Sequence, residues 1–233
     1  MEHFEAIYAA RAAEYHQMIA AEDADGQLLL AIERVVSPRG KRIVDLGTGT
    51  GRLPLLLGGQ AALVVGLDLH RDMLRQNAEQ RRRRGERWEL VQGDMRKLPF
   101  PAASADIVTA GWAIGHMRRW FEADWRSQVR QVLHEMERVV VPGGALIIFE
   151  TLSTGSLTPA PPTPGLGEYY DWLERDWGFR RDTIATDYRF ASVDEAVVRT
   201  EFFFGPQLAA RIRAEGWARL PEWTGVWSKH ISA

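Results

Sequence analysis

The sequence has no cysteine, no long apolar run and almost no excess of charge of either sign. Without cysteine the chain can form no disulfide, thiolate nucleophile or sulfur-ligated metal site. The longest apolar runs, such as Ala145 to Phe149, are far shorter than the roughly 20 residues that cross a bilayer. The 29 lysines and arginines nearly cancel the 31 aspartates and glutamates. The formal charge of -2 therefore gives no general attraction to nucleic acid or anionic lipid.

These absences favour an enzyme or binding protein for small molecules. The N-terminal stretch is acidic and amphipathic and lacks the apolar core of a signal peptide, so we expect a soluble, cytoplasmic protein. Its 233 residues, of which 45% are apolar, can fill one core. We therefore predict a single domain over 1–233, as a monomer or homodimer.

Short apolar runs alternate with helical stretches through the first two thirds of the chain. Two helices are expected in 1–36, before the first run. The runs lie at 43–46, 63–67, 88–91, 107–110 and 145–149. This alternation predicts parallel strands joined by helical crossovers. The helix before the last of these runs carries an apolar stripe from Val129 to Val140, and Pro142 and two glycines should end it.

The composition changes after Glu150. Proline, serine and glycine dominate 151–167 and predict a loop that leaves the sheet. Seven aromatic residues then fall within 168–190. We interpret 151–190 as an inserted lid that covers an aromatic or amphiphilic acceptor, with a dimer interface or simple core as equal alternatives. The segment 191–233 should add two helices and the last strand, with strands expected at 183–189 and 224–231.

A glycine-rich turn follows the first predicted strand. The run from Asp45 continues through Gly47, Thr48, Gly49 and Gly51 into a helix. Glycine permits positive φ and lets a ligand lie against bare backbone, where the helix N-terminus offers free N–H groups. The pattern indicates a nucleotide-like ligand; the alternative is an ordinary tight turn.

Acidic residues end the next two strands. Asp68 follows the second strand and is placed to accept hydrogen bonds from both hydroxyls of a ribose. Its alternative role is to cap the helix from Arg71, for which Asp72 is equally suited. Asp94 and Met95 follow the third strand, where an acid can accept from an exocyclic amine and a thioether can lie on an aromatic ring.

Together these motifs resemble the class I S-adenosylmethionine-dependent methyltransferases. The similarity covers roughly 40–151, the expected cofactor-binding core, and is closest to the small-molecule branch that includes quinone-biosynthesis enzymes. It implies a Rossmann-like α/β fold with a seven-stranded sheet of order 3-2-1-4-5-7-6, strand seven antiparallel, and helices on both faces. It also implies S-adenosylmethionine as cofactor and S-adenosylhomocysteine as product.

The resemblance further implies residue roles. The loop at Gly47, Gly49 and Gly51 would lie against the methionine part of the cofactor, and Asp45 would help to hold its amino group. Asp68 would take the ribose hydroxyls. The remaining roles fall to Leu69 against adenine, Asp94 and Met95 at the adenine edge, and Gly111 and Trp112 along the cofactor and methyl path.

Dinucleotide-dependent dehydrogenases share a glycine loop with an acid about 20 residues later. Their fingerprint needs a glycine at position 52, but that residue is Arg52, and the third glycine is Gly51. An NAD(P)-dependent oxidoreductase is therefore the less favoured interpretation. A phosphate-binding P-loop is excluded because no Lys-Ser or Lys-Thr pair follows the glycines.

Methyl transfer needs a base only when the acceptor must lose a proton. The candidate is His116, six residues after the fourth strand, because its ordinary pKa near 6.5 suits proton removal at neutral pH; the alternative is that it packs the turn. Tyr15 and Trp112 are expected to close over the cofactor with their aromatic faces, or else to pack in the core. The histidine spacing predicts no metal site.

One conspicuous charge run, Arg81 to Arg84, lies just before Gly85. It is typical of a solvated helix end, where cations suit the last carbonyls. An RNA-modifying methyltransferase is the second functional interpretation, although we expect a small-molecule substrate and no nucleic-acid or membrane partner. A non-catalytic module that only binds the cofactor is the third.

Overall fold

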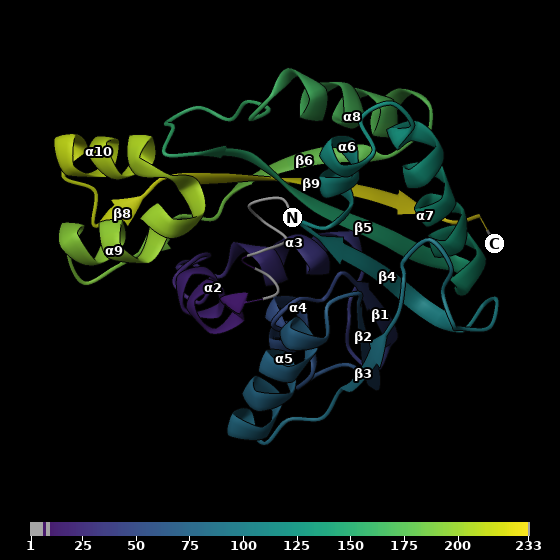
Figure 1. The fold of residues 1–233 in the computed structure, drawn as a ribbon. Helices are drawn as coiled ribbons and strands as arrows, with labels where there is room; N and C mark the ends of the chain where they lie inside the picture. The colour runs from purple at the N-terminus through teal and green to yellow at the C-terminus, as the bar shows by residue number, and fades with distance from the viewer. Residues whose placement is uncertain (1–6, 8–9, 233) are drawn as a thin grey trace.

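The computed structural model describes residues 7 and 10–232, and within them a seven-stranded sheet forms the centre of the fold (Figure 1). Its strands are β1 (Arg42–Leu46), β2 (Leu63–Asp68), β3 (Glu89–Gln92), β4 (Ala105–Gly111), β5 (Val140–Thr154), β6 (Arg180–Ala185) and β9 (Glu222–His230). The order is β3-β2-β1-β4-β5-β9-β6, and β9 runs antiparallel to both of its neighbours. Because β6 and β9 are the sixth and seventh strands of this sheet along the chain, the expected order is confirmed.

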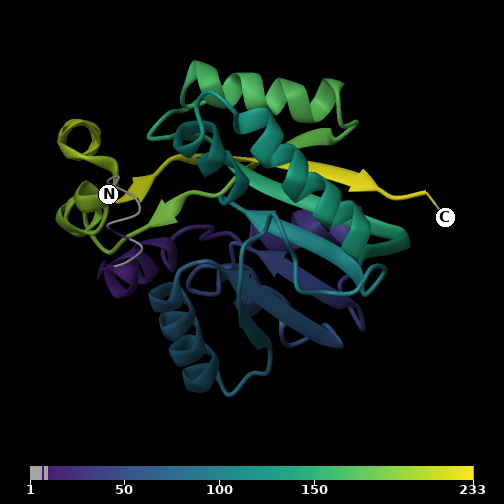
Figure 2. The same cartoon turned by 45° about the vertical axis from the view of Figure 1, so that its right-hand side comes forward.

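Helices cover both faces of the sheet. On one face lie α7 (Trp125–Val139) and α8 (Pro164–Arg175), and on the other lie α3 (Gln27–Val35) and α4 (Arg52–Leu57) (Figures 1 and 2). The predicted stripe of α7 is fully buried at Val129, Val132, Leu133, Met136 and Val139. Such a stripe, spaced at helical intervals, is what fastens α7 to the sheet.

Three further helical segments surround the carboxyl ends of the first strands. They are α5 (Arg71–Arg84), which packs against β2 and β3, and the short η1 (Ile114–His116) and α6 (Met117–Trp120), which connect β4 to α7. The first helix after the undescribed N-terminal residues is α2 (Ala12–Ile19), and it contacts α5. Two helices were expected in 1–36, and the start of the first of them lies outside the described residues. Within the described part of the chain, no helix is long and apolar enough to cross a bilayer.

A smaller lobe projects from one end of the sheet (Figure 1). It consists of β7 (Tyr188–Arg189), α9 (Val193–Phe204), α10 (Pro206–Glu215) and β8 (Arg219–Leu220), and β7 pairs with β8. Helix α9 begins with a capping interaction, because the Ser192 hydroxyl accepts from the Glu195 amide at 3.1 Å. The carboxylate of Glu195 in turn accepts from the Ala191 amide, 2.8 Å away. This lobe packs on α2, so a helix near the start of the chain contacts a segment from its last third.

The structure corrects three predicted boundaries. Strand β5 does not end near Phe149 but continues to Thr154, because β9 pairs with it as far as Glu222. It also begins at Val140, which the sequence had placed in the preceding helix. The single strand expected at 183–189 is two strands: β6 pairs with β9, whereas β7 turns away to pair with β8.

The aromatic residues of α8 follow the alternative of core packing. Tyr169, Tyr170 and Trp172 of α8 are buried in the main core, and Trp125 of α7 makes edge contacts with Tyr169 and Trp172. These side chains therefore hold α8 against the sheet, and Tyr170 also lines a cavity. The preceding proline-rich loop does line a cavity, described below.

Candidate functional site

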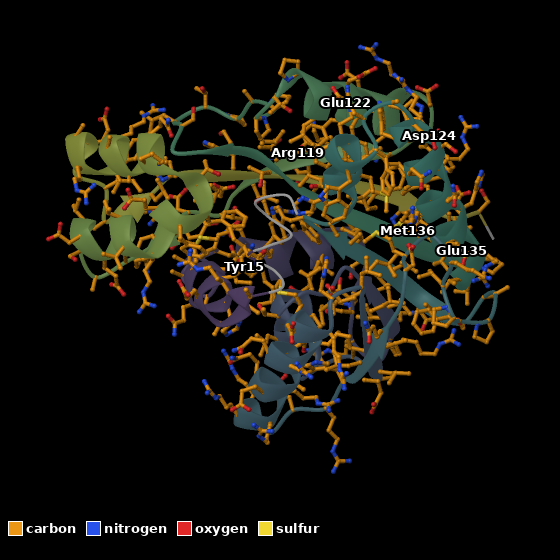
Figure 3. All side chains as sticks on the ribbon, in the orientation of Figure 1. Tyr15, Arg119, Glu122, Asp124, Glu135 and Met136 are labelled. Atoms are coloured by element: carbon orange, nitrogen blue, oxygen red, sulfur yellow. The ribbon has the colours of Figure 1, made fainter. Side chains whose placement is uncertain are left out.

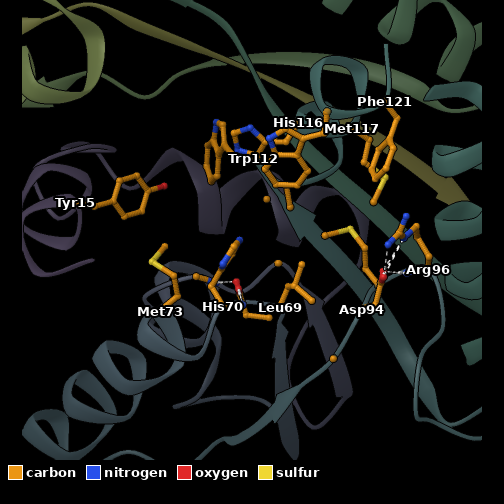
Figure 4. A pocket seen from close by; sticks show the side chains of 18 residues that line it. Tyr15, Leu69, His70, Met73, Asp94, Arg96, Trp112, His116, Met117 and Phe121 are labelled. Carbon is orange, nitrogen blue, oxygen red and sulfur yellow. Dashed lines mark hydrogen bonds and ion pairs between the residues drawn. The ribbon is translucent and has the colours of Figure 1, made fainter. Parts of the chain in front are cut away.

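A cavity of about 340 Å³ lies at the carboxyl ends of β1, β2, β3 and β4 (Figure 4). The structure brings most of the predicted site residues together in its wall. They are Tyr15, Gly47, Gly49, Asp68, Leu69, Asp94, Met95, Gly111, Trp112 and His116. The strand ends that the sequence placed at one edge of the sheet therefore converge on a single enclosed space, as expected for a nucleotide-binding α/β sheet.

The glycine loop is shaped by positive φ and by close packing. Gly47 has a φ of 63°, and a Cβ at this position would overlap the side chain of Ala113. Gly51 has a φ of 97°, and a Cβ there would lie 2.7 Å from Asn77 Oδ1. The first glycine thus keeps the cavity wall bare, whereas Gly51 lets the loop approach α5.

Asp68 ties the loop to the end of β2. Its Oδ2 accepts from the Gly49 amide at 2.8 Å, and its Oδ1 accepts from the His70 amide at 2.8 Å. Burial raises the pKa of this carboxyl, and the hydrogen bonds from His70 and Gly49 oppose that rise. Each carboxylate oxygen has a further lone pair, so Asp68 can still accept from a ligand. Asp72 binds Arg75 at 2.7 Å.

Asp94 is held by Arg96, a residue that sequence reasoning missed. The guanidinium donates to both carboxylate oxygens, with Nη2 2.5 Å from Oδ2, and the Arg96 amide donates to Oδ1 at 2.8 Å. These bonds lower the pKa of Asp94, so it is an ionised acceptor at neutral pH. Both residues line the cavity and Figure 4 shows them paired at its edge.

Three predicted residues lie behind the cavity wall. Asp45 is 2% exposed and accepts from the Thr109 hydroxyl at 2.6 Å. Burial raises the pKa of this carboxyl to about 7. Thr48 packs so closely on Gly66 that a Cβ there would lie 2.7 Å from its hydroxyl oxygen, and Gly51 faces Asn77. Their predicted contacts with a ligand stay predictions; in the structure they support the loop.

Trp112 occupies a strained position at the end of β4. Its φ is 51°, a value that a bulky residue rarely adopts. The indole stacks on Phe149, with ring centroids 5.9 Å apart, and the Arg52 guanidinium lies 4.0 Å from its centre. The indole therefore packs against the core and also lines the cavity, while its contact with a cofactor stays a prediction. Backbone strain of this kind is often found where a side chain must be aimed at a ligand.

A larger cavity of about 930 Å³ adjoins the first. Tyr15, Trp112 and His116 line both, so they form a shared wall. Figure 3 places Tyr15 on α2 and Arg119 and Glu122 beside α6, and all three line the larger cavity. The proline-rich loop contributes 160–163. A second cavity is thus contiguous with the first, which the sequence had not located.

His116 has an environment that opposes protonation. It stacks on Trp120 with ring centroids 5.1 Å apart. Burial, together with the charges of His70 and Arg119, lowers the pKa of His116 to about 4. The ordinary basicity assumed from the sequence is therefore corrected: this imidazole is neutral at neutral pH but is a weak base.

Glu150 is a second titratable group that the sequence analysis missed. It lies near the carboxyl end of the parallel part of β5, is 5% exposed and lines the larger cavity. Its Oε1 accepts from the Gly115 amide at 2.8 Å. Burial raises the pKa of Glu150 to about 8. A polar residue at the end of an otherwise apolar strand was the signal that could have identified it.

Other residues of the smaller cavity carried no clear signal in the sequence. They are His70, Met73, Gly93, Ala113, Met117, Trp120 and Phe121. Most follow a strand end by several residues, and only the path of the loop turns them inward. No group of three or more His, Asp or Glu side chains that could hold a metal ion occurs within residues 7 and 10–232.

Comparison with known proteins agrees with this geometry. Residues 44–148 match the family model described as a methyltransferase domain, and they span the glycine loop and the strand ends that build the smaller cavity. The chain contains a class I S-adenosylmethionine-dependent methyltransferase domain. This methyltransferase domain ends within β5, so α8, the small lobe and much of the larger cavity lie beyond the matched segment.

Similar curated proteins include enzymes with different acceptors. The chain is 33% identical to a demethylmenaquinone methyltransferase of Thermus thermophilus over 60% of this chain and 57% of that protein. It is 36% identical to a malonyl-acyl carrier protein O-methyltransferase of Legionella pneumophila over 50% of this chain and 37% of that protein. The chain thus spans about half the length of the first curated relatives it matches.

Solved structures support the fold. A phosphoethanolamine N-methyltransferase of Haemonchus contortus in complex with S-adenosylmethionine aligns over all of this chain and 60% of its own, with a TM-score of 0.61 and 17% identity. An Aquifex aeolicus SAM-dependent methyltransferase aligns over 85% of this chain and 87% of its own, with a TM-score of 0.54 and 18% identity. The [4+2]-cyclase SpnF also aligns, over 90% of this chain and 81% of its own, with a TM-score of 0.57 and 21% identity. The fold alone therefore does not determine the reaction.

Proposed function

We propose that this chain is an S-adenosylmethionine-dependent methyltransferase that methylates an oxygen, nitrogen or carbon nucleophile of a small molecule by in-line displacement. The observation that carries the proposal is the smaller cavity, which gathers the glycine loop, Asp68, Asp94 and Trp112 at one edge of the sheet. The bare backbone at Gly47 and the remaining acceptor capacity of Asp68 fit an adenosyl group with a charged tail.

The residue roles that the resemblance implies are compatible with the place of these residues in the cavity wall. Gly47 and Gly49 would lie against the methionine part, and Asp68 would accept from the ribose hydroxyls. Asp94 with Met95 would hold the adenine edge, beside Leu69. S-adenosylmethionine supplies an electrophilic methyl group on a sulfonium when it is bound.

The chain's own contribution is to hold the reactants in line in the cavity. Alignment of this kind can supply about 7–11 kcal/mol of the barrier reduction. Trp112 and Tyr15 lie in the wall shared with the larger cavity, where aromatic faces favour a nearby cation. S-adenosylhomocysteine would be the product that has to leave.

The relatives suggest what class of acceptor to test. Their names include quinone precursors and a malonyl-acyl carrier protein. The larger cavity of this chain is lined by Met18, Ile19, Leu166, Tyr170, Phe203 and Phe204, which suits an aromatic or amphiphilic molecule. The loop at 160–163 would then serve as the part of the predicted lid that meets the acceptor.

Removing the Asp68 carboxylate should weaken binding of both sulfonium and thioether ligands. We expect Asp68→Ala to cost about 1–3 kcal/mol of binding free energy, because buried N–H groups and ligand hydroxyls lose their acceptor. Calorimetry with S-adenosylmethionine, S-adenosylhomocysteine and NADH measures this. Asp72→Ala is the matched control, since Asp72 lies nearby but is exposed and pairs with Arg75. Binding of NADH alone would overturn the proposal in favour of an oxidoreductase.

The arginine run gives little support to an RNA substrate. Arg81 donates to the Trp88 carbonyl, and Arg82 and Arg83 pair with Glu79 on the same helix. Three of the four arginines therefore make contacts within the protein at the end of α5. Retardation of transfer RNA by the pure protein at physiological salt would nevertheless favour the RNA-modifying alternative, since binding to phosphates persists there only when many contacts form.

A further inference from the structure

Glu150 is placed where an acceptor would meet the shared wall. Its carboxylate lies against the backbone of Gly115, since a Cβ on that glycine would be 2.8 Å from Oε2 and 3.1 Å from Cδ. The Gly115 amide donates to Oε1, which fixes the direction of the group. The next residue, His116, belongs to the wall between the two cavities. The carboxyl group is thereby held in the larger cavity, next to the wall that the two cavities share.

The groups around Glu150 do not neutralise it. In the part of the chain that the structure describes, no lysine or arginine forms an ion pair with this carboxyl. The Tyr170 hydroxyl donates to the Thr151 carbonyl at 2.7 Å, and Arg118 pairs with Glu168 at 3.1 Å. His116 is neutral at neutral pH. Among the described residues, Glu150 is thus a buried carboxyl group without a cationic partner.

Glu150 and His116 differ in how well they can remove a proton near pH 7. A general base works best when its pKa is close to the working pH. Burial raises the pKa of Glu150 to about 8, whereas that of His116 falls to about 4. The glutamate is therefore the stronger base, although most of the population is protonated at pH 7.

The rest of the larger cavity indicates what kind of molecule loses the proton. Aromatic and aliphatic side chains form much of its wall, which suits an aromatic body. Its three arginines, Arg52, Arg118 and Arg119, outnumber the two glutamates that line it besides Glu150, so there is no excess of negative charge to attract an ammonium group. A carboxylate acceptor is already ionised at neutral pH and needs no base.

We propose that the larger cavity binds an aromatic hydroxyl compound and that Glu150 takes the hydroxyl proton during methyl transfer. The inference rests on the methyltransferase function proposed above. The oxygen lone pair forms the bond to the methyl carbon as the carbon–sulfur bond of the sulfonium breaks, its electron pair going to sulfur. The O–H proton moves to the Glu150 carboxylate, and solvent later removes it.

Glu150→Gln is the discriminating variant because it keeps the shape of the side chain and an oxygen to accept from Gly115. With phenols that are un-ionised at the assay pH, we expect kcat/KM to fall by about 10²–10⁴-fold, the usual contribution of a general base. With nitrophenols that are already ionised, the rates should hardly change. The wild-type rate with un-ionised phenols should rise with pH through about 8, and the variant should lack this rise.

The outcomes separate the inference from the proposed function. An equal loss across all phenols, or an unchanged pH profile, would overturn the role of Glu150. If the wild type methylates amines or carboxylates but no phenol, the acceptor class is wrong while the methyltransferase function stands. If the wild type fails to bind S-adenosylmethionine, the proposed function itself fails. Glu89→Gln, on the exposed face of edge strand β3, is the control for an unrelated glutamate.

Stability provides a second readout that needs no substrate. The folded-state pKa of Glu150, about 8, is raised above its ordinary value of 4.5, so the wild type loses stability as pH rises through this window. Glutamine does not titrate. The melting temperature of Glu150→Gln relative to wild type should therefore increase between pH 4.5 and 8 and then level off. A difference that is constant with pH would show that Glu150 does not titrate as a buried acid.

Discussion

Replacing Gly47 by alanine is expected to weaken the binding of S-adenosylmethionine by about 30-fold or more. The residue has a φ of 63°, where a side chain costs about 1–2 kcal/mol. The new Cβ would also overlap Ala113, and overpacking of this kind costs about 1–3 kcal/mol. Since every 1.4 kcal/mol is about a tenfold change in affinity, a loss of about 30-fold or more is expected if the strain falls on the bound state. Calorimetry measures the affinity directly.

The control for this experiment is Gly85→Ala. Gly85 has a φ of 65° at the end of α5, but a Cβ there meets nothing within 4 Å. The Gly85→Ala variant therefore measures only the cost of placing a side chain at positive φ, at a position that does not line the cavity. Equal affinities for the two variants would show that the bare surface at Gly47 is unimportant for the ligand.

Arg52→Met should destabilise the fold more than any surface ion pair can. Arg52 Nη1 binds Glu22 Oε2 at 2.8 Å, and the side chains are 14% and 4% exposed. The buried Glu222 lies close enough to repel Glu22, and burial raises the pKa of Glu222 well above its ordinary value. Removing the arginine leaves Glu22 buried without its cation, which typically costs about 3–5 kcal/mol. Urea unfolding at neutral pH measures the change in the free energy of unfolding.

Two comparisons sharpen this prediction. Arg75→Met breaks an exposed pair of 2.7 Å with Asp72 and should cost about 0–1 kcal/mol. Combining Arg52→Met with Glu22→Gln should recover part of the loss, because the uncompensated charge is then removed. If Arg52→Met costs no more than Arg75→Met, the buried pair contributes nothing beyond an exposed one.

The smaller cavity could be predicted largely from the sequence because its residues lie at strand ends. In a parallel sheet these ends share one edge, so the spacing of Gly47, Asp68 and Asp94 places them together without knowledge of side-chain positions. The glycine loop adds a local signal, since positive φ is tied to residue type. Arg96 was missed because an arginine two residues after an acid has no distinctive pattern.

The larger cavity could not be predicted, because its wall comes from elements far apart along the chain. Met18 lies on α2, His116 on η1, Glu150 on β5 and Phe204 on α9. The apolar spacing of each element predicts only that one side is buried, not which partner covers it. The burial of the aromatic residues of α8 could not be predicted for the same reason, because Tyr169 and Trp172 pack in the main core against distant segments.

The sequence by itself determined the strands, the turn chemistry of the glycine loop and the edge of the sheet at which a ligand binds, because these follow from local periodicity and backbone preference. Only the tertiary structure decided how strongly each side chain is desolvated. That is why Glu150 becomes the better base and His116 the poorer one. Burial depends on what distant segments place around a group, and no local pattern encodes it.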